Sequence, residues 1–339
     1  MRAATAIFLL LSLPLSAAAG NKTIYGDDSR LDFFEVTNGL ERAAMMKAVS
    51  IFRATALEED GDGFKVKGSV FGSEARRLCP GQRFFEQRGA SYCSGTLIGP
   101  DLVLTAGHCM GEKEKPANRC DTARFVFGFA VERRGEVPER VSAADVYSCS
   151  KVEIYSYDGR TDFAVVRLDR AVSGRTPANI YTRELPAEGR RIFTVGGPYG
   201  LPLKVLNDAT VRAVEEEKGW FRTNLDSSGG NSGGGVFSSL TGLLLGVHTA
   251  SFDPDLVEIP LPAGHGLPET DARVKEGKCK VITRLDQDGG RGKKAYGLSA
   301  IPGLAELVAG GPARASVAAE ELPDISADMP DISRFGSLE

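Results

Sequence analysis

Apolar residues recur along this chain in short runs that turn residues interrupt. In the first half the runs cover residues 84–85, 92–98 and 102–106, with Gly99, Pro100 and Asp101 forming a turn before the last of them. Short apolar runs bounded by Gly and Pro are typical of β-strands. The second half repeats the rhythm at residues 191–195, 204–214, 220–224, 236–237 and 243–247. The pattern therefore predicts an all-β fold built from two antiparallel barrels.

The flanks of this strand pattern look different. Residues 36–57 have a mixed apolar pattern that favours helix, and residues 58–63 form an acidic, glycine-punctuated break. After residue 251 we expect a Pro-rich loop over residues 253–266. A further strand is expected over residues 278–282 and a short helix over residues 301–307.

The two ends of the chain carry segments that we place outside the fold. A basic start, an apolar run over residues 7–15 and small residues at 17–19 indicate a signal peptide over residues 1–19. The run is short for a membrane anchor, which is the alternative. The last segment, 310–339, is acidic and Ala-rich and repeats Pro-Asp-Ile-Ser, so we expect a disordered tail, with a short binding motif as the alternative.

Between these ends we expect an N-terminal extension or propeptide over residues 20–67 and one folded domain over residues 68–309. The signal peptide predicts a secreted protein, extracellular or periplasmic, that has no membrane association after the signal is removed. The 41 basic and 45 acidic residues are nearly balanced, which gives no indication of nucleic-acid binding.

Export changes the interpretation of the six cysteines. In an oxidising compartment they are candidates for disulfides, and the chain has no C-x-x-C or H-x-x-x-H spacing that would indicate zinc. The acidic stretches at 27–28 and 58–62 lack the ligand spacing of a known calcium loop. We therefore expect no metal and no cofactor.

Three segments carry residues that could perform acyl transfer. His108 lies in LTAGHC at residues 104–109, Asp162 in TDFAVVRL at 161–168, and Ser232 in GGNSGG at 229–234. A serine hydroxyl is a poor nucleophile at neutral pH. It needs a base to take its proton and a third group to orient that base and stabilise its charge.

The order histidine, aspartate, serine and these sequence contexts resemble the trypsin-like serine protease family. The resemblance implies two six-stranded antiparallel β-barrels with the active site in the cleft between them. His108 and Asp162 would come from the first barrel and Ser232 from the second. It further implies protein or peptide substrates, and an oxyanion hole formed by the backbone N–H groups of Gly230 and Ser232.

The chain departs from the digestive type of this family at the residue before the serine. That residue is Asn231 rather than an aspartate, and the chain contains no I-V-G-G segment, so an ammonium–aspartate latch is not expected. The GGNSGG pattern is more similar to the bacterial glutamyl-endopeptidase branch. The resemblance covers residues 68–250 well and the flanks poorly.

The resemblance also bears on cysteine pairing. The family commonly bridges the pair that corresponds to Cys93–Cys109, which would hold the histidine loop. Cys120 and Cys149 bracket a predicted hairpin region and form a reasonable second pair. Cys79 and Cys279 are the two that remain.

Two sets of residues give opposite predictions for specificity. Asp226 occupies the position where trypsin-type enzymes attract Arg or Lys. His248 and Ser227 match the residues with which glutamyl endopeptidases hold a substrate carboxylate. We favour cleavage after Glu or Asp; for His248 the alternative is a buried core histidine. The alternative functions are cleavage after Arg or Lys, an esterase with the same triad, and a non-catalytic binding module.

Overall fold

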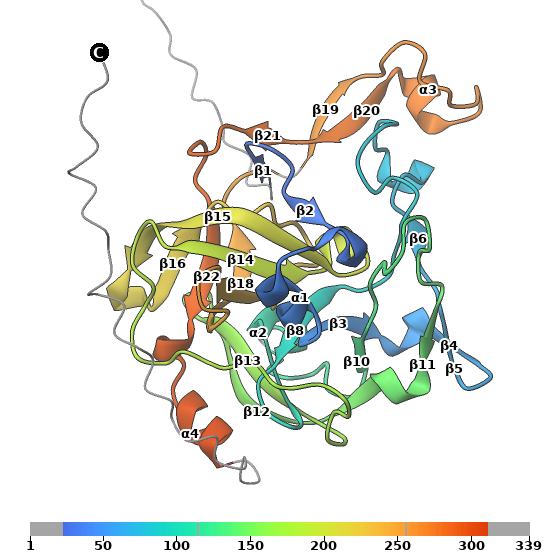
Figure 1. Cartoon of the computed structure of the whole chain (residues 1–339). Helices are drawn as coiled ribbons and strands as arrows, with labels where there is room; N and C mark the ends of the chain where they lie inside the picture. Colours follow the sequence, from blue (N-terminus) through green and yellow to red (C-terminus); the bar gives the residue numbers. More distant parts are fainter. Residues whose placement is uncertain (1–22, 114, 255, 311–339) are drawn as a thin grey trace, which may run out of the picture.

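The first half of the chain folds into a closed barrel of six antiparallel strands (Figure 1). The computed structural model describes residues 23–113, 115–254 and 256–310. Around the barrel the strands follow the order β10 (Ala123–Phe127), β12 (Val146–Tyr157), β13 (Asp162–Leu168), β9 (Leu102–Thr105), β8 (Cys93–Leu97) and β3 (Ala48–Arg53).

The second half forms a second antiparallel barrel. Its strands follow the order β14 (Arg191–Gly196), β17 (Gly235–Ser238), β18 (Leu244–Ser251), β22 (Lys293–Gly297), β16 (Trp220–Thr223) and β15 (Lys204–Glu215). Pairing of β14 with β15 closes the ring, and β2 (Arg30–Leu31) pairs with β15 from outside it. The predicted all-β fold of two six-stranded barrels is confirmed.

Short elements decorate the barrels. The strands are β1 (Ile24–Tyr25), β4 (Leu57–Asp60), β5 (Gly63–Val66), β6 (Ser69–Val70), β7 (Arg88–Gly89), β11 (Arg140–Ser142), β19 (Leu256–Pro260), β20 (Lys278–Ile282) and β21 (Arg284–Leu285). The α-helices are α1 (Gly39–Met45), α2 (Gly107–Met110), α3 (Ala272–Glu276) and α4 (Leu304–Ala309). The 3-10 turns are η1 (Phe33–Glu35), η2 (Ala54–Ala56), η3 (Glu74–Arg76), η4 (Ala143–Asp145), η5 (Pro198–Gly200), η6 (Glu216–Lys218) and η7 (Leu298–Ala300).

The barrels begin earlier in the chain than Gly68, the predicted start of the folded domain. Of residues 36–57, only α1 is α-helical, and Asn38 caps it by accepting hydrogen bonds from the N–H groups of Leu40 and Glu41. The next apolar run becomes β3, which pairs with β8 and β10. The β-branched Val49 and Ile51 alternate along this run, and both are fully buried, so strand pairing and packing determine its structure.

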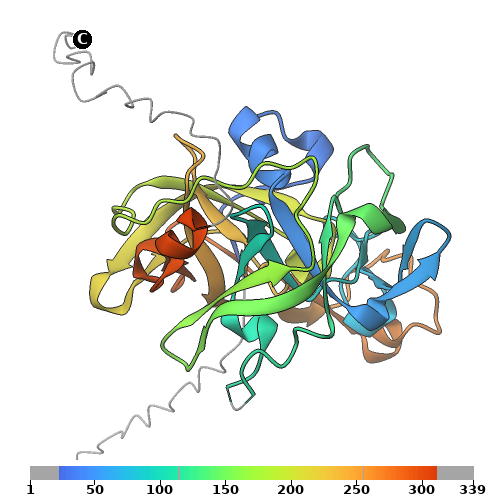
Figure 2. The same cartoon turned by 90° about the horizontal axis from the view of Figure 1, so that it is seen from below.

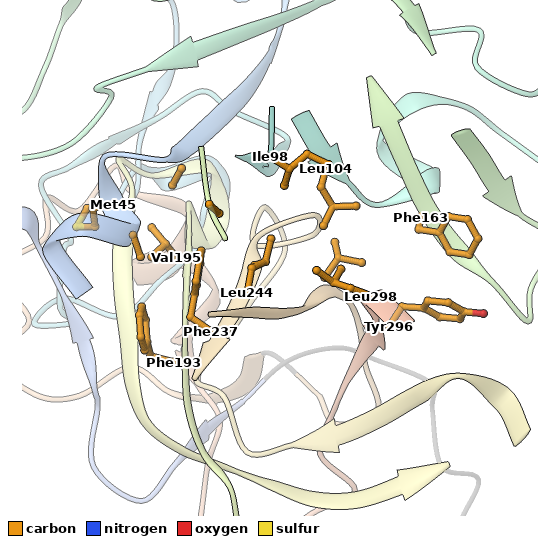
Figure 3. Close-up of a cluster of buried hydrophobic side chains, with 14 of the residues drawn as sticks. Met45, Ile98, Leu104, Phe163, Phe193, Val195, Phe237, Leu244, Tyr296 and Leu298 are labelled. Carbon is orange, nitrogen blue, oxygen red and sulfur yellow. The ribbon is translucent and has the colours of Figure 1, made fainter. Parts of the chain in front are cut away.

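The two barrels share a hydrophobic core. Ile98, Leu104 and Phe163 contribute from the first barrel, and Figure 3 shows them facing residues of the second. The second-barrel members labelled there include Val195, Phe237, Leu244, Tyr296 and Leu298. The C-terminal helix α4, red in Figure 2, adds Leu304 to the same cluster. This continuous core fixes the position of one barrel against the other.

Other predicted elements also differ in the structure. Residues 84–85 form no strand, and Phe84 has a positive φ of 65°. The start of the predicted Pro-rich loop is instead β19, which pairs with β20 in a hairpin that Figure 1 shows projecting beside α3. The predicted signal peptide, residues 1–19, and all of the predicted tail except Gly310 lie outside the described residues.

Three disulfides cross-link the chain. They are Cys93–Cys109, Cys120–Cys149 and Cys79–Cys279. Three such bonds are typical of a protein that matures in an oxidising compartment. Within the described residues, no helix is both long and apolar enough to cross a membrane.

Candidate active site

His108 lies in the short helix α2, directly after strand β9. The turn into this helix requires glycine at position 107, because a Cβ there would lie 2.2 Å from the backbone oxygen of Ser156. The Cys93–Cys109 disulfide ties the next residue to β8. The histidine is therefore fixed from both sides along the chain.

Asp162 holds the histidine ring. It opens strand β13, which pairs with β9, so the strand register brings the carboxylate to the end of the histidine segment. The backbone N–H of His108 donates to Asp162 Oδ1 at 2.9 Å, and His108 Nδ1 lies 2.8 Å from Asp162 Oδ2. With Nδ1 as the donor in this contact, Nε2 is left as the acceptor that a general base requires.

Ser232 lies in the loop between β16 and β17, and the first barrel holds this loop. The N–H of Ser94 donates to Ser232 O at 2.8 Å, and Ser94 Oγ donates to Gly230 O at 2.7 Å. On the other side the N–H of Gly233 donates to His248 O at 2.7 Å. Backbone contacts with both barrels thus order the serine loop.

One cavity brings the three residues together. It has a volume of about 580 Å³, and both barrels contribute to its wall. Ser232 is 4 % exposed and the His108 side chain 29 %. Among the described residues no hydrogen bond joins Ser232 Oγ to His108, and such contacts are commonly long in structures without substrate. The residues that line the cavity are His108, Tyr157, Gly159, Thr161, Asp162, Ser232, Thr249, Ala250, Ser251 and Lys294.

The two expected oxyanion donors lie in this same loop. Within the described part of the chain, no backbone hydrogen bond uses the N–H of Gly230 or of Ser232. Gly230 has a φ of +97°, and a Cβ there would lie 2.3 Å from Gly197 O, so only glycine fits this position. Their role as oxyanion donors stays a prediction.

The three expected specificity residues do not line the cavity. Ser227 is 1 % exposed and His248 is fully buried on β18, behind the serine loop. Among the described residues the Ser227 hydroxyl has no hydrogen-bond partner. The structure therefore places the hydroxyl and the imidazole beneath the surface of the site.

Asp226 contacts the N-terminal segment. Its Oδ1 accepts from the N–H of Tyr25 at 2.8 Å, and its Oδ2 accepts from the N–H and Oγ of Ser29 at 2.9 and 2.8 Å. Burial raises the pKa of this carboxyl to about 6, although the three hydrogen bonds act to lower it.

The structure adds residues that the sequence analysis did not identify. Tyr157 packs near the His108 ring, with 5.9 Å between ring centroids. Lys294 on β22 lines the cavity and donates to Arg160 O at 3.1 Å, and burial lowers its pKa. Thr249 and Ala250 directly follow His248 on β18, so the sequence around His248 could have indicated them as lining residues. No local sequence pattern indicates Lys294, because Lys294 reaches the cavity only through the pairing of β22 with β18.

One cluster has the donor atoms of a metal site. It consists of Cys93, His108 and Cys109. Its two sulfur atoms are joined in a disulfide, so neither is a thiolate that could bind a metal. The two cysteines therefore cross-link the histidine loop to β8 and do not bind a metal.

The chain has two closed antiparallel barrels, and both barrels line a cavity that holds a histidine–aspartate pair and a serine. This arrangement is that of double-barrel proteins with the chymotrypsin fold. Residues 93–247 match the family model described as trypsin-like peptidase domain. Over these residues the chain is therefore similar to a trypsin-like peptidase domain.

Solved structures of three other proteins are similar to this chain at 16 % identity. A Glu endopeptidase aligns over 68 % of this chain and 88 % of its own, with a TM-score of 0.42. A serine endoprotease from Yersinia pestis aligns over 74 % and 64 %, with a TM-score of 0.39. A protein named HBP aligns over 81 % and 96 %, with a TM-score of 0.45. These scores are too low for any of the three to carry a conclusion about this chain.

Proposed function

We propose that this chain is a secreted serine endopeptidase that uses His108, Asp162 and Ser232. The observation that carries the proposal is the hydrogen-bonded pair of His108 and Asp162 in one cavity with Ser232. The three disulfides support secretion, since such bonds persist in oxidising compartments.

The proposed reaction is acyl transfer through a covalent intermediate. Ser232 Oγ attacks the peptide carbonyl carbon while His108 Nε2 takes the hydroxyl proton, and Asp162 stabilises the imidazolium. The N–H groups of Gly230 and Ser232 bind the oxyanion, and the C–N bond breaks as His108 returns the proton to the leaving amine. Water then hydrolyses the acyl-enzyme by the same route, releasing the acid and restoring Ser232.

We further propose cleavage after Glu or Asp. His248 and Ser227 lie beneath the surface of the cavity, so a substrate carboxylate would have to reach past the cavity wall to accept hydrogen bonds from them. Such a bond to a charged carboxylate is about twice as strong as a neutral one. The unpartnered Ser227 hydroxyl supports this proposal. Asp226 is a weaker candidate for binding Arg or Lys, because its carboxylate already accepts three hydrogen bonds from Tyr25 and Ser29.

The test is a digest of a denatured protein mixture with the secreted protein, followed by sequencing of the new termini. We expect cuts that follow Glu or Asp, and no cuts with the Ser232→Ala variant prepared in the same way. Cuts after Arg or Lys would contradict the acidic specificity and leave the peptidase proposal standing. The same cuts from the Ser232→Ala variant would contradict the peptidase proposal itself.

A further inference from the structure

Asp226 joins two parts of the molecule that are far apart in sequence. Its carboxylate is 3 % exposed and accepts three hydrogen bonds of 2.8–2.9 Å from Tyr25 and Ser29. A buried carboxylate is costly unless hydrogen bonds satisfy it, so these three donors stabilise Asp226 in its buried position.

The N-terminal segment, residues 23–32, is itself firmly anchored. Strand β1 pairs in parallel with β21 and β2 pairs with β15, as Figure 1 shows at the top of the second barrel. Tyr25 Oη donates to Asp253 at 2.6 Å. Asp32 forms a buried ion pair with Lys204. The donors that hold Asp226 are therefore attached to the barrel independently of Asp226.

A short path of contacts leads from Asp226 to Ser232. Ser227 donates its N–H to Leu225 O at 2.8 Å. The N–H of Ser228 donates to Asn231 Oδ1 at 2.8 Å, and the N–H of Asn231 donates to Ser228 O at 2.9 Å. These bonds close a compact turn that ends immediately before Ser232. Displacing Asp226 would therefore displace this turn and the expected oxyanion donor of Gly230 within it.

We infer that Asp226 is a positioning residue: the N-terminal segment holds its carboxylate and thereby keeps the serine loop, residues 225–232, in the catalytic arrangement. This inference rests on the proposed function for its catalytic consequence. The donors are the backbone N–H groups of Tyr25 and Ser29 and the Ser29 hydroxyl, and none of them is an α-amino group. Asp226 then affects the cleavage rate of every substrate by the same factor, and it does not determine which residue precedes the cut.

The experiment compares three variants of the secreted protein: Asp226→Asn, Ser29→Ala and a control, Thr23→Val. The control removes another hydrogen bond of the same segment, from Thr23 Oγ1 to Pro254 O, and leaves the Asp226 contacts in place. One readout is amide hydrogen exchange of residues 225–232, and the other is kcat and KM on peptides with Glu, Gln or Arg before the cut.

We expect exchange of residues 225–232 to accelerate about tenfold in Ser29→Ala and more in Asp226→Asn, with little change in the barrel strands. The kcat should fall by about tenfold or more, by the same factor for all three peptides and at constant KM. Thr23→Val should match the parent in both readouts. If Asp226→Asn does not fold, Ser29→Ala still tests the inference, because it removes one of the three hydrogen bonds to Asp226.

Two results would overturn the inference. One is unchanged exchange of residues 225–232 in the folded variants. The other is a loss of activity in Asp226→Asn confined to the Arg peptide, which would make Asp226 a specificity residue. Amide hydrogen exchange can be measured whether or not the protein cleaves peptides. A parent protein that is inert toward peptides, yet shows accelerated exchange in the variants, would contradict the proposed function while supporting the positioning contact.

Discussion

At the scale of single residues, the site depends on how one carboxylate holds one imidazole. Asp162 binds both the backbone N–H and the Nδ1 of His108, so it fixes the position of the residue and the tautomer of its ring together. A neutral amide in its place could accept one hydrogen bond, but it could not stabilise the imidazolium.

We therefore expect Asp162→Asn to lower kcat by about 10⁴-fold with little effect on folding, because the ring loses its correct tautomer and its counter-charge. Steady-state kinetics on a Glu-containing peptide would measure the effect. Asp169→Asn provides the control: Asp169 directly follows the same strand, and its exposed side chain pairs with Arg170. A fall of less than tenfold in Asp162→Asn would show that Asp162 does not support the base.

At the scale of elements, local pattern predicted the strands whose partners are near in sequence. Residues 92–98 and 102–106 became the hairpin β8–β9, because the turn at Gly99, Pro100 and Asp101 lies between two apolar runs. The strand β3 was missed, since the helical pattern before it continues into residues whose strand partners are β8 and β10. Pairing over such distances depends on tertiary context and leaves little local signal.

The disulfides give a prediction at this same scale. Cys93 and Cys109 are 16 residues apart, so replacing both with Ala should lower the free energy of unfolding by about 3 kcal/mol. Replacing Cys120 and Cys149, 29 residues apart, should cost a similar amount. Urea unfolding would measure both, and only the first pair should also lower kcat, because Cys109 adjoins His108. An equal effect on kcat would contradict a local role for the Cys93–Cys109 bond.

At the scale of the whole molecule, the residues of the candidate site differ in how far the sequence could predict them. His108, Asp162 and Ser232 each stand in a recognisable local context, and the fold brings them to one cavity. The contact of Tyr25 with Asp226 spans 201 positions and has no local signature. The N-terminal segment consequently looked like an extension, although it pairs with the second barrel.

The buried Asp226 makes a prediction about stability and pH. Its pKa is about 6 in the folded protein and near 3.8 when unfolded, so the folded state holds the extra proton between about pH 4 and 6. Stability contributed by this group therefore falls as pH rises through that window, by up to about 3 kcal/mol. The other carboxylates contribute equally to the free energy of unfolding of the parent and of Asp226→Asn, so their contribution cancels in the difference between the two proteins.

Urea unfolding of both proteins from pH 4 to pH 7 would measure this effect. The free energy of unfolding of the parent minus that of Asp226→Asn should decrease between pH 4 and 6 and then level off. A difference that grows with pH would show that the folded state lowers the pKa of Asp226.

The most direct test of the central claim, that Ser232 is an activated nucleophile, is covalent labelling with a serine-directed phosphonate followed by peptide mapping. The account predicts one adduct per folded molecule on Ser232, and none in the Ser232→Ala or His108→Ala variants. A folded, fully processed protein that stays unlabelled, or that carries the adduct on another residue, would contradict it.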